Sequence, residues 1–192
     1  MNTLFVISGP SGVGKGTLVK QIGKVMPELA VSVSCTTREP RKGEVNGREY
    51  HFMKREEFER RIREGDFLEY DEHFGNYYGT PKSFVIEEVK HKSVVLEIDV
   101  VGALNAKEAL KDSVENIVLI FVDPPDLQTL IKRLKGRSSE SEEELNARLA
   151  RVEYELSLKD RYDYILVNDD LSAATARLKE MIQKETEKQE RR

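Results

Sequence analysis

The residues best suited to chemistry lie near the start of the chain, in the run Gly9-Pro10-Ser11-Gly12-Val13-Gly14-Lys15. This run has the spacing G-x-x-x-x-G-K and follows a short apolar segment, Thr3–Ser8, that is typical of a buried strand. Its glycines let backbone N–H groups point inward around a polyphosphate, and Lys15 adds a mobile cation for the outer phosphates. The run, with Gly16 and Thr17 after it, therefore predicts a loop that binds a nucleoside triphosphate.

The residue after the lysine bears on how a metal ion is held. Gly16 stands where Ser or Thr usually places a hydroxyl on Mg²⁺, and Thr17 comes one position later. One step along a helix turns a side chain by about 100°, so Thr17 is not an automatic substitute. Because Mg²⁺ keeps several waters at phosphate sites, we expect it to be held mainly by nucleotide phosphates and water. The sequence assigns no protein ligand to the ion.

A second group of polar residues follows in the segment Ser34-Cys35-Thr36-Thr37-Arg38-Glu39-Pro40-Arg41, with Tyr50 and the Tyr77-Tyr78 pair further on. Arginine forks and phenol hydroxyls suit a phosphate dianion, which they bind with charge-assisted and geometrically fixed hydrogen bonds. Two arginines in a loop are also ordinary surface chemistry. By itself, this segment leaves open whether it forms an acceptor site or a plain surface loop.

The elements that must position these residues follow an alternating pattern. Strand-like apolar runs recur at Val94–Ile98, Ile117–Val122 and Tyr164–Val167. Helical periodicity follows the glycine loop as far as Met26 and recurs at Gly102–Leu110, Asp126–Leu134, Glu142–Leu158 and Leu171–Gln183, with a charged, solvated end after it. Strands that alternate with helices predict an α/β fold with a parallel sheet flanked by helices.

Residues 31–82 interrupt this rhythm. The alternation in Val31–Ser34, Tyr50–Met53 and Phe67–Phe74 is typical of half-exposed antiparallel strands, and Phe74–Gly79 looks like a hairpin connection. We expect an inserted mixed or antiparallel lobe here. The polar run Lys135–Glu144 carries Arg137, and its composition leaves open whether it forms an ordinary surface loop or a small lid at 135–147. The core would then comprise residues 1–30, 83–134 and 148–192.

Composition sets outer bounds on function. The chain has 192 residues, a net charge of −4 and 34% charged residues, values that indicate a folded chain of one domain with a small appended lobe and no nucleic-acid charge signature. The apolar runs are far shorter than the ~20 residues that a membrane helix needs. With no recognisable secretory signal and a single cysteine, Cys35, cytoplasmic residence is expected.

Three blocks together resemble guanylate kinase: the loop SGPSGVGKGT, the segment VSCTTREPRKGEVNGREYHF and the segment GDFLEYDEHFGNYYGT. The resemblance continues through EIDVVGA, GRSSESEEELNARL and VNDDL and so covers nearly the whole chain. It implies a phosphate-loop core, a GMP-binding lobe and a lid, and transfer of the terminal phosphoryl group of ATP to GMP with Mg²⁺. The substrates would be ATP and GMP, with tolerance of dGMP and the oligomeric state, monomer or homodimer, left open.

The resemblance also implies roles for individual residues. It places Ser34, Arg38, Arg41, Tyr50 and Tyr78 around the GMP phosphate with Glu44 nearby, Glu69 and Thr80 on the guanine, and Asp99 facing GMP and the metal region. Lys15, Arg38, Arg41, Arg137 and Arg148 would neutralise charge during transfer. Guanine offers two adjacent donors that a carboxylate at Glu69 can accept together, and Thr80 can donate toward O6. The chain carries Glu97, Thr80 and Cys35 where eukaryotic relatives carry Asp, Ser and Ser.

Two other functions fit parts of this pattern. Guanylate-kinase-like domains also occur as non-catalytic binding modules in scaffold proteins, but those typically have a degraded phosphate loop and neighbouring domains, for which this chain is expected to have no room. Another nucleoside monophosphate kinase is the second alternative, because Gly-Lys-Gly-Thr also ends the loop of adenylate kinases. Glu69 and the GNYYGT block favour guanine.

Overall fold

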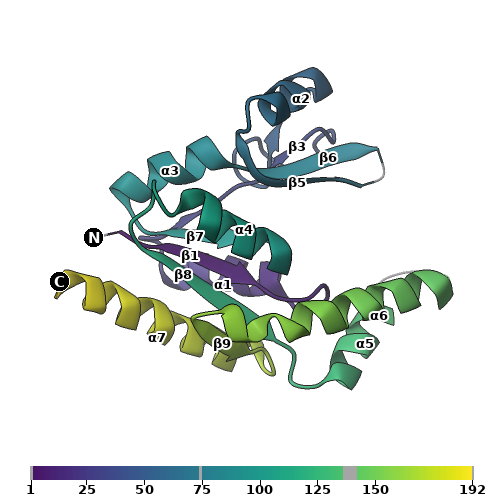
Figure 1. Ribbon diagram of the computed structural model, residues 1–192, viewed down its shortest axis with the longest axis vertical. Coiled ribbons are helices and arrows are strands. Elements are labelled where there is room, and N and C mark those ends of the chain that lie inside the picture. The colour runs from purple at the N-terminus through teal and green to yellow at the C-terminus, as the bar shows by residue number, and fades with distance from the viewer. Residues whose placement is uncertain (1, 74, 136–141, 192) are drawn as a thin grey trace.

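A five-stranded parallel sheet forms the centre of the molecule (Figure 1). The computed structural model describes residues 2–73, 75–135 and 142–191; of residues 73, 135, 142–148 and 190 it describes the backbone only. The strands of the sheet, in spatial order, are β2 (Ala30–Val31), β7 (Val94–Glu97), β1 (Leu4–Ser8), β8 (Ile117–Asp123) and β9 (Tyr164–Val167). The carboxyl ends of β1 and β7 therefore lie side by side at one edge of the sheet, where the phosphate loop begins.

Helices cover both faces of this sheet. They are α1 (Lys15–Val25), α3 (Lys82–His91), α4 (Val100–Leu110), α5 (Leu127–Lys135), α6 (Glu142–Ser157) and α7 (Leu171–Glu190), with a short 3₁₀ turn at Lys159–Arg161. The predicted α/β fold with a parallel sheet flanked by helices is confirmed. Among the residues described, no helix is both long enough and apolar enough to span a membrane.

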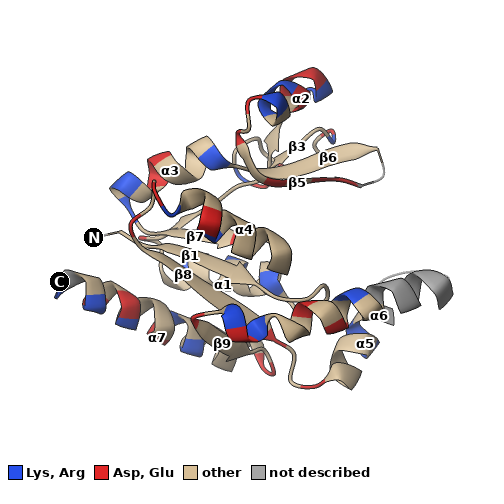
Figure 2. Cartoon of the chain, viewed as in Figure 1, with Lys and Arg blue, Asp and Glu red and all other residues tan. Residues whose placement is uncertain are grey.

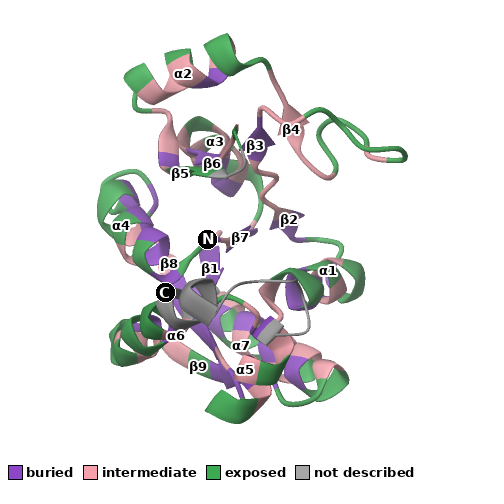
Figure 3. Cartoon of the chain, turned by 90° about the vertical axis from the view of Figure 1, so that its right-hand side faces the viewer, coloured by how far each residue is buried: buried purple, intermediate pink, exposed green. Residues whose placement is uncertain are grey.

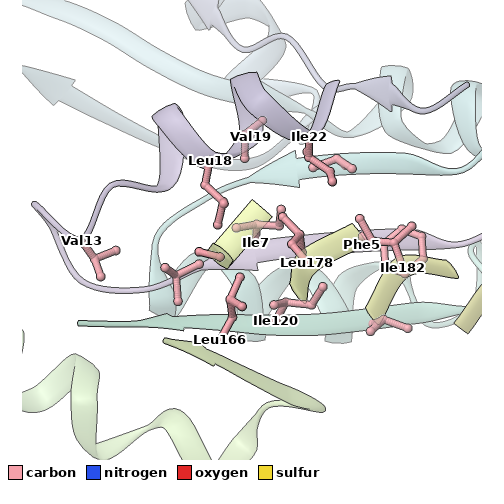
Figure 4. Close-up of a cluster of buried hydrophobic side chains, with 14 of the residues drawn as sticks. Phe5, Ile7, Val13, Leu18, Val19, Ile22, Ile120, Leu166, Leu178 and Ile182 are labelled. Atoms are coloured by element: carbon pink, nitrogen blue, oxygen red, sulfur yellow. The ribbon is translucent and has the colours of Figure 1, made fainter. Parts of the chain in front are cut away.

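The central strands are apolar throughout because both of their faces are buried. Successive side chains of β1 point to opposite faces, so Phe5 and Ile7 join the cluster with α1 and α7, whereas Leu4 and Val6 join the cluster with α3 and α4. Figure 4 shows the first cluster, in which Leu18 and Ile22 of α1, among others, meet the sheet. This packing fixes the start of α1, and hence the phosphate loop, against the end of β1.

A smaller mixed sheet lies beside the core as a separate layer (Figures 1 and 3). Its strands, in spatial order, are β4 (His51–Phe52), β3 (Cys35–Thr36), β6 (Asn76–Pro81) and β5 (Phe67–His73). The β3–β4 pair is parallel, and the β3–β6 and β5–β6 pairs are antiparallel. A hairpin is present where the sequence predicted one, but Phe74–Gly79 is not its connection: Asn76 pairs with His73, and Asn76–Gly79 belong to β6.

Helix α2 (Arg55–Arg63) covers this small sheet, and the sequence pattern did not predict it. Its sequence REEFERRIR has few apolar residues to show a helical period, and Figure 2 shows both charge signs along it. Phe58 is fully buried and stacks on Phe67 and Tyr77, with ring centroids 4.2 and 5.2 Å apart. Burying one such ring contributes about 1.5–3 kcal/mol, so one aromatic contact anchors a helix whose surface is otherwise charged.

The structure corrects two further expectations. Val31 does not begin an antiparallel strand: with Ala30 it forms the parallel edge strand β2 of the main sheet, paired with Val94 and Val95 of β7.

The charged end after Gln183 is not merely solvated, because α7 continues to Glu190. Glu185 and Gln189, four residues apart on one face, are buried, and the Tyr164 hydroxyl donates to Glu185. Glu185 and Gln189 therefore lie on a face of α7 that is packed in the tertiary structure.

Candidate functional site

The phosphate loop joins β1 to α1, as its sequence predicted. Gly14, the residue before the helix, has φ 98°, and Gly9 has φ 150°. A Cβ at Gly9 would lie 2.3 Å from the Val122 carbonyl oxygen, so the close approach to β8 requires glycine. No side chain caps the first turn of α1, which leaves its N-terminal N–H groups for an anion.

Side chains from two segments distant in sequence hydrogen-bond to the backbone of the phosphate loop. The buried side-chain amide of Asn168 donates to the Val13 carbonyl at 2.8 Å, and Arg133 donates to the same oxygen at 3.3 Å. Val13 itself is fully buried. Asn168 lies one residue after the end of β9, at the carboxyl edge where parallel sheets place functional groups. The sequence analysis assigned no role to Asn168 or Arg133, although the position of Asn168 after a strand was a usable signal.

Lys15 is the half-buried cation of this loop. Its ammonium donates to the carbonyl oxygens of Gly9 at 2.7 Å and Pro10 at 3.3 Å. Burial lowers the pKa of Lys15, and the nearby Glu97 carboxylate opposes that shift. Burial likewise raises the pKa of Glu97, and Lys15 opposes it. The two groups therefore stabilise each other's charge at the end of β7.

Two cavities open on this loop. One of about 410 Å³ runs along the loop and the start of α1. A larger one of about 760 Å³ lies between the core and the small sheet. The smaller cavity is lined by six of the predicted triphosphate-binding residues: Ser11, Gly12, Gly14, Lys15, Gly16 and Thr17. Lys20 and Glu97, which were not predicted to bind the triphosphate, line it as well. The larger cavity is lined by six of the predicted acceptor residues: Ser34, Glu44, Tyr50, Glu69, Tyr78 and Asp99.

Glu69 lies on β5 inside the larger cavity and is paired with Thr80 of β6. The Thr80 hydroxyl donates to Glu69 Oε1 at 2.8 Å, and Thr80 is fully buried. Burial raises the pKa of Glu69, against the Thr80 hydrogen bond, which lowers it. The antiparallel register that sets Glu69 opposite Thr80 creates this contact. Thr80 thus orients the carboxylate, and it is not among the residues that line the cavity.

The arginines of the predicted acceptor segment do not line the cavity themselves but contact Glu44, which does. Arg38 donates to both carboxylate oxygens of Glu44 at 3.0 Å, and its guanidinium carbon lies 5.6 Å from the Tyr50 ring centroid. The backbone N–H of Arg41 donates to Glu44 as well, at 2.7 Å, and the Arg41 side chain is exposed. The backbone hydrogen bond from Arg41 and the Arg38 fork hold the pKa of Glu44 below its ordinary value.

Asp99 caps α4 and faces the larger cavity. Its Oδ1 accepts from the Gly102 N–H at 2.6 Å, and its Oδ2 pairs with Arg151 at 3.0 Å. Arg151 also pairs with Glu155, which is buried. These contacts join α4 to α6 beside the cavity, and the sequence analysis missed Arg151. Its position three residues after Arg148, on the same side of a predicted helix, was the available signal.

Comparisons with known proteins agree over the length of the chain. The family model described as Guanylate kinase matches residues 1–185. Guanylate kinases of Streptococcus thermophilus and Gloeobacter violaceus are 48% and 45% identical to it, over 95% of this chain and 86% and 87% of theirs. The crystal structure of guanylate kinase from Anaplasma phagocytophilum has a TM-score of 0.71 at 33% identity, covering 96% of this chain and 86% of that one.

The chain belongs to the guanylate kinase family. A shikimate kinase structure from Bacteroides thetaiotaomicron, at 16% identity and a TM-score of 0.55, shares the fold alone. Two arginines expected in a guanylate kinase lid are not placed here: Arg137 lies outside the described residues, and Arg148 belongs to α6 with only its backbone described. Of the predicted guanylate kinase site, Lys15, Glu69 and Asp99 come together around one cavity, and Arg38, Arg41 and Thr80 support its wall.

Proposed function

We propose that this chain transfers the terminal phosphoryl group of ATP to GMP, giving ADP and GDP. The observation that carries the proposal is that the phosphate-loop cavity and the acceptor cavity share a wall, formed by Lys15, Gly16, Lys20 and Glu97. A donor triphosphate on the loop and a monophosphate in the larger cavity would meet at this wall. Membership of the guanylate kinase family supports the same reaction.

The acceptor base is proposed to bind against Glu69. Its ionised carboxylate accepts one hydrogen bond from Thr80 and lines the cavity, so its remaining lone pairs could accept from a base bound there. Guanine presents N1–H and an exocyclic amine side by side, whereas adenine has no N1 donor. A buried carboxylate left unpaired is costly, so Glu69 would select guanine.

The GMP phosphate is proposed to bind at Ser34, Tyr50 and Tyr78, with Arg38 and Arg41 approaching from behind. In the structure Arg38 Nη2 donates to both oxygens of Glu44 and Nη1 donates to the Glu39 carbonyl, which keeps the guanidinium in place near Tyr50. A phosphate dianion offers the same bidentate geometry as a carboxylate, and Arg38 has donors on both edges of its fork. Glu44 thus serves as the group that positions this arginine.

The transfer step needs alignment and positive charge more than covalent chemistry. An oxygen of the GMP phosphate attacks the terminal phosphorus of ATP in line, and the bond from that phosphorus to the oxygen of ADP breaks. Lys15 would leave the Gly9 and Pro10 carbonyls for the phosphates, and Arg137 and Arg148 would join from the lid. Water excluded from the closed site would not compete as the acceptor.

A magnesium ion fits the residues present. In the part of the chain that the structure describes, no three His, Cys, Asp or Glu side chains are grouped so that they could hold a metal. The ion would be held by nucleotide phosphates and water, and the side-chain oxygens that line the loop cavity beside it are those of Ser11, Thr17 and Glu97. When bound, the ion supplies neutralising charge to the phosphates.

The proposed organisation follows from these roles. We propose that residues 31–82 carry most of the acceptor site, residues 135–147 the lid, and residues 1–30, 83–134 and 148–192 the core, with Val31 paired in the main sheet and Asp99 reaching the acceptor cavity from the core. The lid assignment rests on the resemblance to the family, because residues 136–141 lie outside the described residues.

A substrate panel tests the proposed reaction. ADP release from ATP and Mg²⁺ is measured with GMP, dGMP, AMP, CMP and UMP side by side, with a reaction lacking acceptor as the blank. We expect rapid ADP release with GMP and rates near the blank with AMP, CMP and UMP. Equal or faster turnover of AMP would contradict the role of Glu69 and point to another nucleoside monophosphate kinase.

A further inference from the structure

One of the four residues at the shared wall of the two cavities has no role in the site described so far. Lys15 is the loop lysine and the first residue of α1, Gly16 follows it in the first turn, and Glu97 faces Lys15. The fourth, Lys20, is a second cation that lines both the loop cavity and the acceptor cavity. Phosphoryl transfer places its largest negative charge where these cavities meet.

The face of α1 that looks into the acceptor cavity leaves space for Lys20. That face consists of Gly16, Val19, Lys20 and Gly23, and the two glycines lie four residues before and three residues after Lys20 on one stripe. Helical side chains lean toward the N-terminus and cover the preceding turn. The turn before Lys20 on this stripe is Gly16, which has no side chain. The Lys20 side chain can therefore run over Gly16 toward the phosphate loop.

The opposite wall of this space is Glu97. A Cβ built on Gly16 would lie 3.4 Å from Glu97 Oε2, so Gly16 and the Glu97 carboxylate are near neighbours. Lys15 reaches the same region but donates to the loop carbonyls. Within the part of the chain that the structure describes, Lys20 has no hydrogen bond or ion pair, and its side chain is exposed. Its ammonium is therefore not committed to a protein acceptor there.

We propose that Lys20 is a second phosphate-binding lysine, which contacts the phosphate oxygens of the two nucleotides where they meet. This inference rests on the proposed function. During transfer the bond from the terminal phosphorus to ADP breaks as the bond to the GMP phosphate oxygen forms, and Lys20 keeps its proton and supplies positive charge to the equatorial oxygens. Gly16, where a serine or threonine is usual, leaves the path for this lysine open.

The first test measures binding without turnover. The probe is adenosine and guanosine joined by five phosphates, which fills both cavities at once, and its affinity is measured by calorimetry for the wild type, Lys20→Met and Lys24→Met. Methionine keeps the length of the chain and removes its charge. Lys24 is the matched control, because it lies on the same helix, is exposed, and lines neither cavity.

We expect Lys20→Met to bind the linked probe about 10- to 100-fold more weakly, because it loses one charge-assisted contact. Lys24→Met should bind the probe within about twofold of the wild type. Affinities for ATP alone and GMP alone should fall less than the affinity for the linked probe. An unchanged affinity in Lys20→Met, or an equal loss in both variants, would overturn the proposal.

Kinetics supply the second test. In the ADP-release assay with GMP, wild-type turnover establishes the reaction independently of Lys20. Lys20→Met should then lower kcat about 10- to 100-fold at saturating substrates, and Lys20→Arg, which keeps the charge, should recover most of that loss. Melting temperatures should match the wild type, because the side chain is exposed. If kcat stays within twofold in Lys20→Met, or if the arginine variant is equally impaired, Lys20 does not bind the phosphates.

Discussion

Replacing Glu69 with glutamine tests the proposed guanine recognition separately from the rest of the site. The substitution keeps the size and shape of the side chain on β5 and changes one oxygen to an amide nitrogen. In the structure Glu69 Oε1 already accepts from the Thr80 hydroxyl at 2.8 Å. The glutamine oxygen would take that bond, which leaves its NH₂ group directed at the donors of guanine. Two donors would then face each other in a buried site.

The magnitude follows from what is lost. One hydrogen bond to a charged acceptor contributes about 1.5–3 kcal/mol, and the unpaired guanine donor adds its own desolvation cost. The affinity for GMP should therefore fall by at least about 10-fold and up to about 150-fold. ATP affinity should remain within about twofold, because Glu69 lines the acceptor cavity and not the phosphate-loop cavity.

The assay is GMP titration at saturating ATP, with calorimetric binding of each nucleotide in parallel. Glu72→Gln is the matched control: it lies on the same strand, is exposed, and pairs with Arg55 outside the cavity. We expect the control to keep the wild-type KM for GMP. A KM for GMP that is also unchanged in Glu69→Gln would refute the assignment of the guanine site to this carboxylate.

The same carboxylate sets a pH dependence. Burial raises the pKa of Glu69 above its ordinary value of 4.5, so protonation begins at a higher pH than for an exposed glutamate. Only the ionised form accepts both guanine donors. As pH falls toward and below the raised pKa, GMP affinity should fall in the wild type and stay flatter in Glu69→Gln. The free energy of unfolding depends on pH in the opposite direction to GMP affinity. Protonated Glu69 stabilises the folded state, and this stabilisation is lost as pH rises through the raised pKa. Parallel acid limbs in the two proteins would contradict this reasoning.

Four further outcomes are expected. Lys15→Met should lower kcat about 10²- to 10³-fold with an unchanged melting temperature, checked by ADP release and calorimetry; near-normal turnover would contradict its role. Arg38→Lys keeps the charge but loses the bidentate guanidinium. It should raise the KM for GMP about 10-fold or more and leave the KM for ATP unchanged. Cys35 is buried with its pKa raised to about 11, so iodoacetamide at pH 8 should label it only after unfolding, as read by mass spectrometry. Asn168→Ala removes a buried anchor of the Val13 carbonyl and should lower the free energy of unfolding by about 1–3 kcal/mol in urea titration; no change would mean that Arg133 alone holds the loop.

The hydrophobic pattern of the sequence predicted those strands and helices in which burial follows a regular pattern along the element. The runs that became β1, β7, β8 and β9 are apolar because helices cover both faces of the sheet, and periodicity shows this directly. Helix α2 was missed because a single phenylalanine carries most of its buried contact. The end of α7 was misjudged because Glu185 is buried against Tyr164, a partner 21 residues away in sequence. No local pattern encodes such a contact.

By itself, the sequence determined the phosphate loop, since glycine conformation and a lysine at the start of a helix are local properties of seven consecutive residues. It also provided the acceptor residues, through their resemblance to a family. Only the tertiary structure decided how these residues work together. Strand register set Thr80 opposite Glu69, so that the threonine hydroxyl donates to the carboxylate. The packing of α1 against the end of β7 brought Lys20 and Glu97 to the wall between two cavities, because contacts across the sheet, and not sequence spacing, set which side chains share a space.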